Sequence, residues 1–144
     1  MGVLSVDGSQ EAQQGMNDSG DARPVVLVVE DFEDNRFMMR RLLEMSGYRV
    51  VEAVNGNQAV ERAAGDRPDI ILMDLSLPQL DGLAATRRIR AQEQSRRVPI
   101  VAVSAHDSAD FHAEALAAGC NEYVTKPIDF DQLVQLLDRL TAKS

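Results

Sequence analysis

Short runs of consecutive apolar residues, separated by stretches with helical periodicity, constrain the fold of this chain more than any other feature. Three runs are apolar at every position: residues 25–29, 70–73 and 100–103. A parallel strand that is covered on both faces has this pattern, whereas a half-solvated strand alternates apolar with polar residues. Residues 48–54 and 122–125 mix the two kinds, which favours strands at the edges of a sheet. The sequence therefore predicts three central strands and two edge strands.

The stretches between these strands have the periodicity of helices. We predict helices at residues 34–46, 57–64, 83–92 and 108–118, and a last one that starts at Asp129, where Gln132 completes a sequence resembling a capping box. Parallel strands need right-handed crossovers, so five strands alternating with five helices indicate an α/β fold. We expect a flavodoxin-like, doubly wound, five-stranded parallel sheet in the order 2-1-3-4-5 with five helices.

Two of the predicted helices carry a concentration of one residue type, methionine on the first and arginine on the third. The first helix carries Met38, Met39 and Met45 beside two leucines, and we interpret this face as core packing. Five arginines gather around the third helix and its exit, at positions 87, 88, 90, 96 and 97. We expect these arginines to form a solvated face.

Length and composition limit the organisation of the chain. At 144 residues there is room for one domain, which we place at residues 24–144. Residues 1–23 are rich in Gly, Ser, Gln and Asp, so we interpret them as a flexible leader or a tag. The initial Met and the short tail after Leu140 favour a free-standing protein.

Charge and hydropathy exclude several classes of protein. The net charge of −8 argues against direct DNA binding, which favours a basic face. No apolar run approaches the ~18 residues of a membrane span, and the N-terminus lacks a signal-peptide pattern, so we expect a cytoplasmic protein. A single cysteine, Cys120, excludes an intramolecular disulfide and a cysteine-rich metal site.

Chemically active side chains follow four of the predicted strands. The first strand ends in Glu30 and Asp31, the third in Asp74, the fourth in Ser104, and the fifth leads into Lys126. Ligands of open parallel sheets bind outside the carboxyl ends of the strands, so these side chains should converge there. Lys126 is one of only two lysines, against thirteen arginines, which makes a lysine at this place notable.

Three carboxylates in one pocket repel one another, and a hard divalent cation relieves that repulsion. Oxygen ligands without His or Cys favour Mg²⁺, with Mn²⁺ as a substitute, over zinc. The bound cation would attract a phosphate-bearing donor, and Asp74 could then act as a nucleophile that forms an aspartyl phosphate. Lys126 and Ser104 would each donate to a phosphoryl oxygen.

The same residues stand in four motif blocks that resemble those of response-regulator receiver domains of the CheY type. The blocks are Val28-Val29-Glu30-Asp31, Leu72-Met73-Asp74-Leu75-Ser76-Leu77-Pro78 with Asp81-Gly82, Val103-Ser104-Ala105, and Tyr123-Val124-Thr125-Lys126-Pro127. The resemblance covers residues 25–140. It implies a phosphoacceptor module of a two-component or phosphorelay system, phosphorylated by a sensor histidine kinase or a histidine phosphotransfer protein, and not a turnover enzyme.

The resemblance also assigns roles to individual residues. Asp74 would be the phosphoacceptor. Asp31, Asp74 and the backbone carbonyl of Ser76 would bind Mg²⁺ directly, and Glu30 would act through water. The Lys126-Pro127 bond matches a peptide that is often cis in the family.

A second group of roles concerns switching. Ser104 and Tyr123 match the family's switch pair, a hydroxyl and an aromatic ring that move on phosphorylation. Ser76 and His106 stand at two positions that tune the phosphoryl lifetime. We expect residues 108–140 to contact a downstream protein or to support phosphorylation-dependent homodimerisation.

Three alternatives compete with this interpretation. Haloacid-dehalogenase-type phosphatases need a second Asp two residues after the nucleophile, where this chain has Ser76. A flavodoxin-like FMN binder needs a Gly- and hydroxyl-rich phosphate loop after the first strand, where this chain is acidic. A non-phosphorylated pseudo-receiver would act only as an interaction module, but it would have lost one or more of the site residues that this chain retains.

Overall fold

The structure is a computed structural model that describes residues 22–77 and 80–142. In these ranges strands and helices alternate regularly. The strands are β1 (Val25–Val29), β2 (Arg49–Ala53), β3 (Ile70–Asp74), β4 (Ile100–Ser104) and β5 (Glu122–Thr125), and the helices are α1 (Glu33–Met45), α2 (Gly56–Gly65), α3 (Gly82–Ala91), α4 (Ala109–Ala118) and α5 (Phe130–Thr141). The predicted leader lies outside the described residues except for its last two positions.

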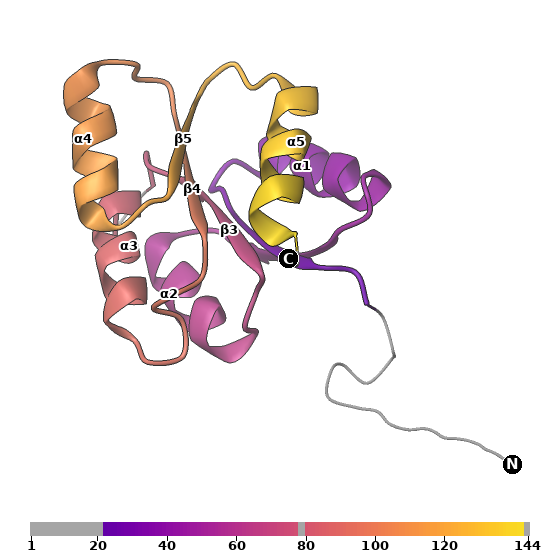
Figure 1. Cartoon of the computed structure of the whole chain (residues 1–144), viewed down its shortest axis with the longest axis horizontal. Helices are drawn as coiled ribbons and strands as arrows, with labels where there is room; N and C mark the ends of the chain where they lie inside the picture. The colour runs from indigo at the N-terminus through magenta and orange to yellow at the C-terminus, as the bar shows by residue number, and fades with distance from the viewer. Residues whose placement is uncertain (1–21, 78–79, 143–144) are drawn as a thin grey trace, which may run out of the picture.

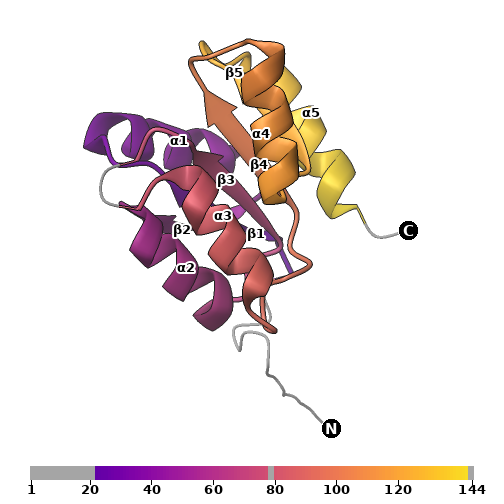
Figure 2. The same cartoon turned by 90° about the vertical axis from the view of Figure 1, so that its left-hand side faces the viewer.

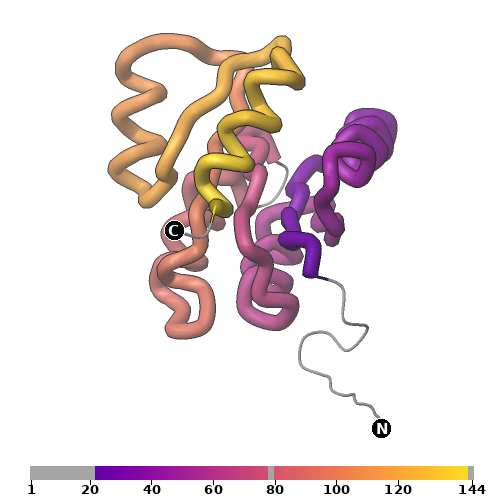
Figure 3. The backbone as a smooth tube through the Cα atoms, turned by 45° about the vertical axis from the view of Figure 1, so that its right-hand side comes forward, coloured from indigo at the N-terminus to yellow at the C-terminus, as the bar shows by residue number. Residues whose placement is uncertain are grey.

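The strands form one parallel sheet in the order β2-β1-β3-β4-β5, as predicted. The central strands β3 and β4 are buried at every position, whereas the edge strand β5 is only half-buried throughout. The loops that follow β4 and β5 lie together at one end of the sheet (Figure 3). This end carries the carboxyl termini of the parallel strands, where the sequence places its acidic residues.

Helices cover both faces of the sheet, with α1 and α5 on one side and α2, α3 and α4 on the other (Figures 1 and 2). Alternate strand residues divide between the two layers: Leu27 and Ile71 belong to the core beneath α2, α3 and α4, and Val26 and Ile70 to the core beneath α1 and α5. This division explains why the central strands are apolar at every position. None of the helices in the described part of the chain is long and apolar enough to cross a membrane.

Helix ends follow local sequence signals. The side chains of Asn55, Asp81, Ser108 and Asp129 each accept a hydrogen bond from a backbone N–H in the first turn of the helix that follows. Helix α4 ends at Gly119, whose φ of +117° lies in the left-handed region that favours glycine. The predicted helix start at Asp129 is therefore confirmed.

The interpretation of the methionine-rich face of α1 as core packing is wrong for two of the three methionines. Leu43 is fully buried, but Met38 is 53% exposed and Met45 is 78% exposed. At 100° per residue, Met38 and Met45 lie about 140° and 160° around the helix from Leu43. Only Met39 packs partly against the core cluster on this face of the sheet.

The expectation of a solvated arginine face is wrong for Arg90. Its guanidinium donates to the carbonyl oxygens of Gly119 (3.0 Å), Arg96 (3.1 Å) and Val98 (2.6 Å) and to Asn121 Oδ1 (2.8 Å). The Asn121 side chain in turn accepts from the backbone N–H of Ile100 at the start of β4. Arg90 therefore joins the end of α4 to the connection that precedes β4.

Candidate functional site

Three carboxylates meet at the carboxyl end of the sheet. Glu30 and Asp31 follow β1 directly, and Asp74 is the last residue of the neighbouring strand β3. One carboxylate oxygen from each of the three lies within 4.8 Å of the others. The predicted convergence of these acids is confirmed. It follows from the parallel pairing of β1 with β3, which brings the ends of both strands to one edge.

Asp74 is the most deeply placed of the three acids, at 5% exposure. Its Oδ1 accepts a hydrogen bond from the backbone N–H of Ser76 at 2.9 Å. Its Oδ2 lies 3.4 Å from Nζ of Lys126, which enters the site from the residue after β5. The backbone N–H of Lys126 donates to the Ser104 carbonyl, and the Lys126-Pro127 peptide is cis. Asp74 thus faces two acids and one cation.

Glu30 is held close to Asp74 in a partly buried position. Its Oε2 accepts a hydrogen bond from the backbone N–H of Phe32 at 3.0 Å. Burial raises the pKa of the Glu30 carboxyl above its ordinary value, and the negative charge of Asp74 acts in the same direction. A group of carboxylate oxygens with this mutual repulsion suits a hard divalent cation.

Ser104 ends β4, the strand next to β3. The side chain is 1% exposed, and its Oγ accepts a hydrogen bond from the backbone N–H of His106 at 3.0 Å. The backbone N–H of Leu75, the residue after Asp74, donates to the Val103 carbonyl at 3.0 Å. Ser104 therefore stands on the strand beside Asp74, while Ser76 and His106 are exposed on the loops that follow these strands.

Tyr123 lies apart from the acids, against the loop after β4. Its hydroxyl donates to the His106 carbonyl at 2.7 Å, and its ring stacks on that of His112 with centroids 3.9 Å apart. Asp107 joins this group, because its Oδ1 lies 3.2 Å from His112 Nε2 and accepts a hydrogen bond from Thr125. The sequence reasoning missed His112, which meets Tyr123 only through the packing of α4 beside β5, and Asp107, which contacts His112 and Thr125 from the loop after β4.

A cavity of about 450 Å³ opens beside the acids. Its lining includes Asp74 and Lys126 together with the apolar side chains of Met38, Met39 and Leu42 from α1. The partial exposure of Met38 and Met39 thus places apolar surface next to the charged site.

The chain is similar to known signalling proteins over the region that folds in this way. Residues 26–138 match the family of response regulator receiver domains. The polar-differentiation response regulator DivK of Brucella anthropi is 35% identical over 112 residues, which cover 78% of this chain and 91% of that protein.

Solved structures give the same result. The receiver domain of the sensor histidine kinase PA1611 of Pseudomonas aeruginosa, with a magnesium ion in its active-site cleft, is 43% identical, with a TM-score of 0.78 over 85% of this chain and all of that one. The chemotaxis protein CheY4 of Vibrio cholerae is 29% identical, with a TM-score of 0.78 over 83% of this chain and 99% of that one. The chain therefore belongs to the response regulator receiver domains, the phosphoacceptor modules of two-component signalling.

Proposed function

We propose that Asp74 is the phosphoacceptor of this receiver domain. One observation carries the proposal: the nearly buried carboxylate of Asp74 stands with those of Glu30 and Asp31 at the end of the sheet, 3.4 Å from the Lys126 ammonium. A cation this close to the nucleophile can hold a phosphoryl oxygen by charge. Receiver domains in general act in signalling and not as turnover enzymes.

The acid cluster, which consists of Glu30, Asp31 and Asp74, would hold Mg²⁺. Asp31, Asp74 and the Ser76 carbonyl would bind the ion directly, and Glu30, whose side chain is longer, would act through water. Mn²⁺ would substitute, because the donor set consists of oxygen atoms alone. When bound, Mg²⁺ would neutralise negative charge on the transferring phosphoryl group. The magnesium ion in the similar Pseudomonas aeruginosa receiver domain supports this assignment.

The phosphoryl group would come from a phosphohistidine of a sensor kinase or a phosphotransfer protein. A carboxylate oxygen of Asp74 forms the new P–O bond, while the P–N bond to the imidazole breaks and its electron pair stays on nitrogen. Lys126 and the hydroxyl of Ser104 would donate to the phosphoryl oxygens. Ser76 and His106, on the exposed loops beside the acceptor, would tune how long the phosphoryl group persists.

Output would depend on Ser104 and Tyr123. In this structure Ser104 Oγ accepts from His106 N–H, and Tyr123 donates to the His106 carbonyl, so both side chains contact one loop residue. Movement of the Ser104 hydroxyl toward a phosphoryl group would shift that loop and release the Tyr123 ring. The face formed by residues 108–140 would then change, and we expect it to bind a downstream protein or a second copy of the chain. Phosphorylation shifts this equilibrium only by its differential contacts in the two states.

Phosphorylation with a small donor tests the acceptor assignment. The full chain is incubated with acetyl phosphate, with and without Mg²⁺, and its intact mass is measured. We expect the wild type to gain one phosphoryl group only with Mg²⁺, and Asp74→Asn to gain none. Glu114→Gln, an exposed acid-to-amide change on α4, is the matched control and should be labelled like the wild type. A label that persists on Asp74→Asn would refute the assignment.

Amide NMR shifts test whether residues 108–140 form the output face, the surface that changes on phosphorylation. On phosphorylation we expect changes beyond the immediate site to concentrate between Ser104 and Leu140. Changes concentrated instead on residues 37–43 of α1 would point to a different output surface.

A further inference from the structure

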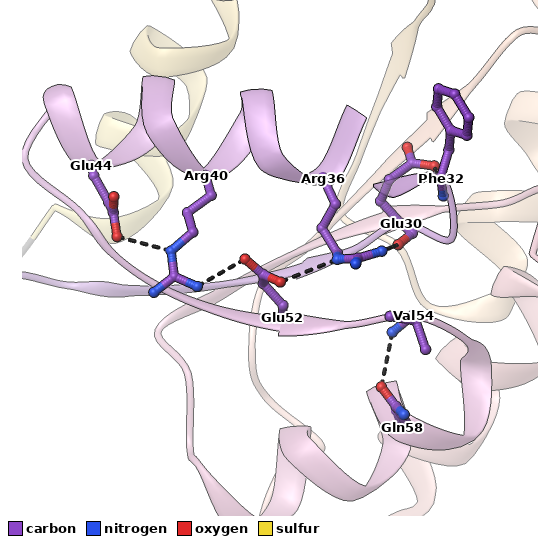
Figure 4. A network of polar contacts seen from close by, with 8 residues as sticks. All are labelled: Glu30, Phe32, Arg36, Arg40, Glu44, Glu52, Val54 and Gln58. Carbon is purple, nitrogen blue, oxygen red and sulfur yellow. Dashed lines mark hydrogen bonds and ion pairs between the residues drawn. The ribbon is translucent and has the colours of Figure 1, made fainter. Parts of the chain in front are cut away.

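Arg36, on α1, joins the edge strand of the sheet to the acid cluster. Its Nε donates to Glu52 Oε1 on β2 at 3.1 Å, and its Nη1 donates to the backbone carbonyl of Glu30 at 3.1 Å. Figure 4 shows the guanidinium lying between these two partners. The Arg36 side chain is only 16% exposed, so these contacts replace much of its hydration. A planar guanidinium can serve two acceptors at once because its donors point in fixed directions.

Glu30 lies between β1 and α1, outside both elements. Three contacts fix its position: its N–H donates to the Ala53 carbonyl at 3.0 Å, its carboxylate accepts from Phe32 N–H, and its carbonyl accepts from Arg36. Of these three, the contact with Arg36 is the one made by a side chain of another residue. Among these contacts, Arg36 is therefore the side chain through which the Glu30 backbone, and with it the carboxylate, can be positioned.

Glu52 holds Arg36 in place. The Glu52 carboxylate also accepts from Arg40 Nη1 at 2.8 Å, and Arg40 Nε donates to Glu44 at 3.0 Å (Figure 4). Burial alone would raise the pKa of Glu52, but the two guanidinium groups lower it below its ordinary value. Glu52 therefore remains charged as the common partner of two arginines, of which only Arg36 reaches Glu30.

We propose that Arg36 is a positioning residue for the metal site: held by Glu52, it fixes the Glu30 backbone and so sets where the Glu30 carboxylate stands in the acid cluster. This inference rests on the proposed function, since it assumes that Glu30, Asp31 and Asp74 bind Mg²⁺. It adds to that function a contribution from the edge strand β2, which carries Glu52 near its carboxyl end but none of the three acids.

Charge and positioning predict opposite effects for loss of Arg36. A cation near the acid cluster repels Mg²⁺, so by charge alone its removal should strengthen Mg²⁺ binding. Loss of the contact that orients a ligand-bearing residue should weaken binding, and removal of such outer contacts costs metal sites about tenfold or more in affinity. The direction of the change therefore separates the two explanations.

Arg40→Gln is the matched control for Arg36→Gln. Both changes remove one positive charge and one hydrogen bond to Glu52, but Arg40 does not contact Glu30 in the described structure. A third variant, Arg36→Lys, keeps the charge and can pair with Glu52, but it lacks the fork that reaches both partners. It serves as the second test if Arg36→Gln folds poorly.

The experiment is a titration of each full-length variant with MgCl₂ alone, followed through amide NMR shifts near Asp74. We expect about tenfold weaker Mg²⁺ binding for Arg36→Gln and a smaller loss for Arg36→Lys, with binding unchanged or tighter for Arg40→Gln. In the metal-free state, the Phe32 amide signal should move in the two Arg36 variants and stay in place in Arg40→Gln.

Three outcomes would overturn the inference. If Arg36→Gln and Arg40→Gln change the affinity for Mg²⁺ equally, Arg36 acts on the site only through its charge. Unchanged or tighter binding by both Arg36 variants would exclude a positioning role, while the proposed metal site would stand. Failure of the wild type to bind Mg²⁺ would refute the proposed metal site together with the inference.

Discussion

Replacement of Asp74 by Asn should stabilise the metal-free protein while abolishing its function. Asp74 is 5% exposed, and its carboxylate lies within 4.8 Å of those of Glu30 and Asp31. One opposite charge, Lys126 Nζ, lies 3.4 Å away. Asn has nearly the same shape, and its side-chain oxygen can still accept from the Ser76 N–H. The change therefore removes one negative charge with little disturbance of packing.

The size of the stabilisation expected for Asp74→Asn follows from these distances. Two like charges at 4.8 Å repel by about 1 kcal/mol at the dielectric constant of water and about 3.5 kcal/mol at an effective value of ~20. The attraction of Asp74 to Lys126 at 3.4 Å ranges from about 1 to 5 kcal/mol over the same limits. Two repulsions exceed one attraction by about 0.5–2 kcal/mol, and an amide also avoids the desolvation of a buried carboxylate. We expect Asp74→Asn to gain about 1–2 kcal/mol.

Urea unfolding at pH 8 measures this gain in stability, once in the presence of a chelator and once in excess Mg²⁺. The free energy of unfolding of the wild type should rise with Mg²⁺, because the ion binds the folded state, and that of Asp74→Asn should rise much less. Glu114→Gln controls for the change in net charge and should match the wild type. If Asp74→Asn is less stable than Glu114→Gln without metal, the carboxylates do not repel one another in the way that their distances imply.

Three further predictions concern other parts of the molecule. Tyr48→Phe should cost about 1.5–3 kcal/mol at pH 7, because the 2.6 Å bond from its hydroxyl to Asp138 is lost. Burial, and after it the hydrogen bond to Asp138, raises the pKa of Tyr48 from 10.0 to about 12. As the pH rises, the unfolded chain loses this proton before the folded one does, so the stability that Tyr48 contributes is complete below pH 10 and declines toward pH 12. The difference in the free energy of unfolding between the wild type and Tyr48→Phe, measured in urea, should therefore shrink between pH 10 and 12. A constant difference would contradict the shift. Arg90→Gln should lose about 2–3 kcal/mol in the same assay, because its backbone acceptors lose a charged donor, whereas Arg87→Gln, on the exposed side of α3, should change stability little. Lys126→Arg should still bind Mg²⁺ but should uncouple phosphorylation from the amide shifts of the output face, since a planar fork cannot replace a compact ammonium; normal shifts in that variant would exclude this role.

The sheet order and the acid cluster could be predicted from the sequence because both depend on local patterns and one general rule. Apolar runs identify the buried strands, and parallel pairing brings the residues after them to one edge. Asp74 and Glu30 therefore meet although 44 positions separate them in the sequence. No knowledge of side-chain packing is needed for this result.

The remaining features depend on how elements face one another, which periodicity does not determine. The helical spacing of the α1 methionines is compatible with burial, yet Met45 lies on the far side of the helix from Leu43. Arg90 belongs to an exposed-looking arginine cluster, but its guanidinium reaches carbonyl groups at the end of α4 and before β4. Glu52, a half-buried glutamate between Val51 and Ala53 on β2, was the one available signal for Arg36, because a charged residue there needs a partner.

The position of the phosphoryl group in the chain decides whether the assignment of Asp74 is right. The protein is phosphorylated with acetyl phosphate and Mg²⁺ and reduced with borohydride, which converts an aspartyl phosphate to homoserine, and its peptides are then sequenced by mass spectrometry. We predict homoserine at position 74 and unmodified Asp at position 31. Homoserine at Asp31, or a phosphoryl group on another type of residue with Asp74 unchanged, would contradict the assignment of Asp74 as the phosphoacceptor.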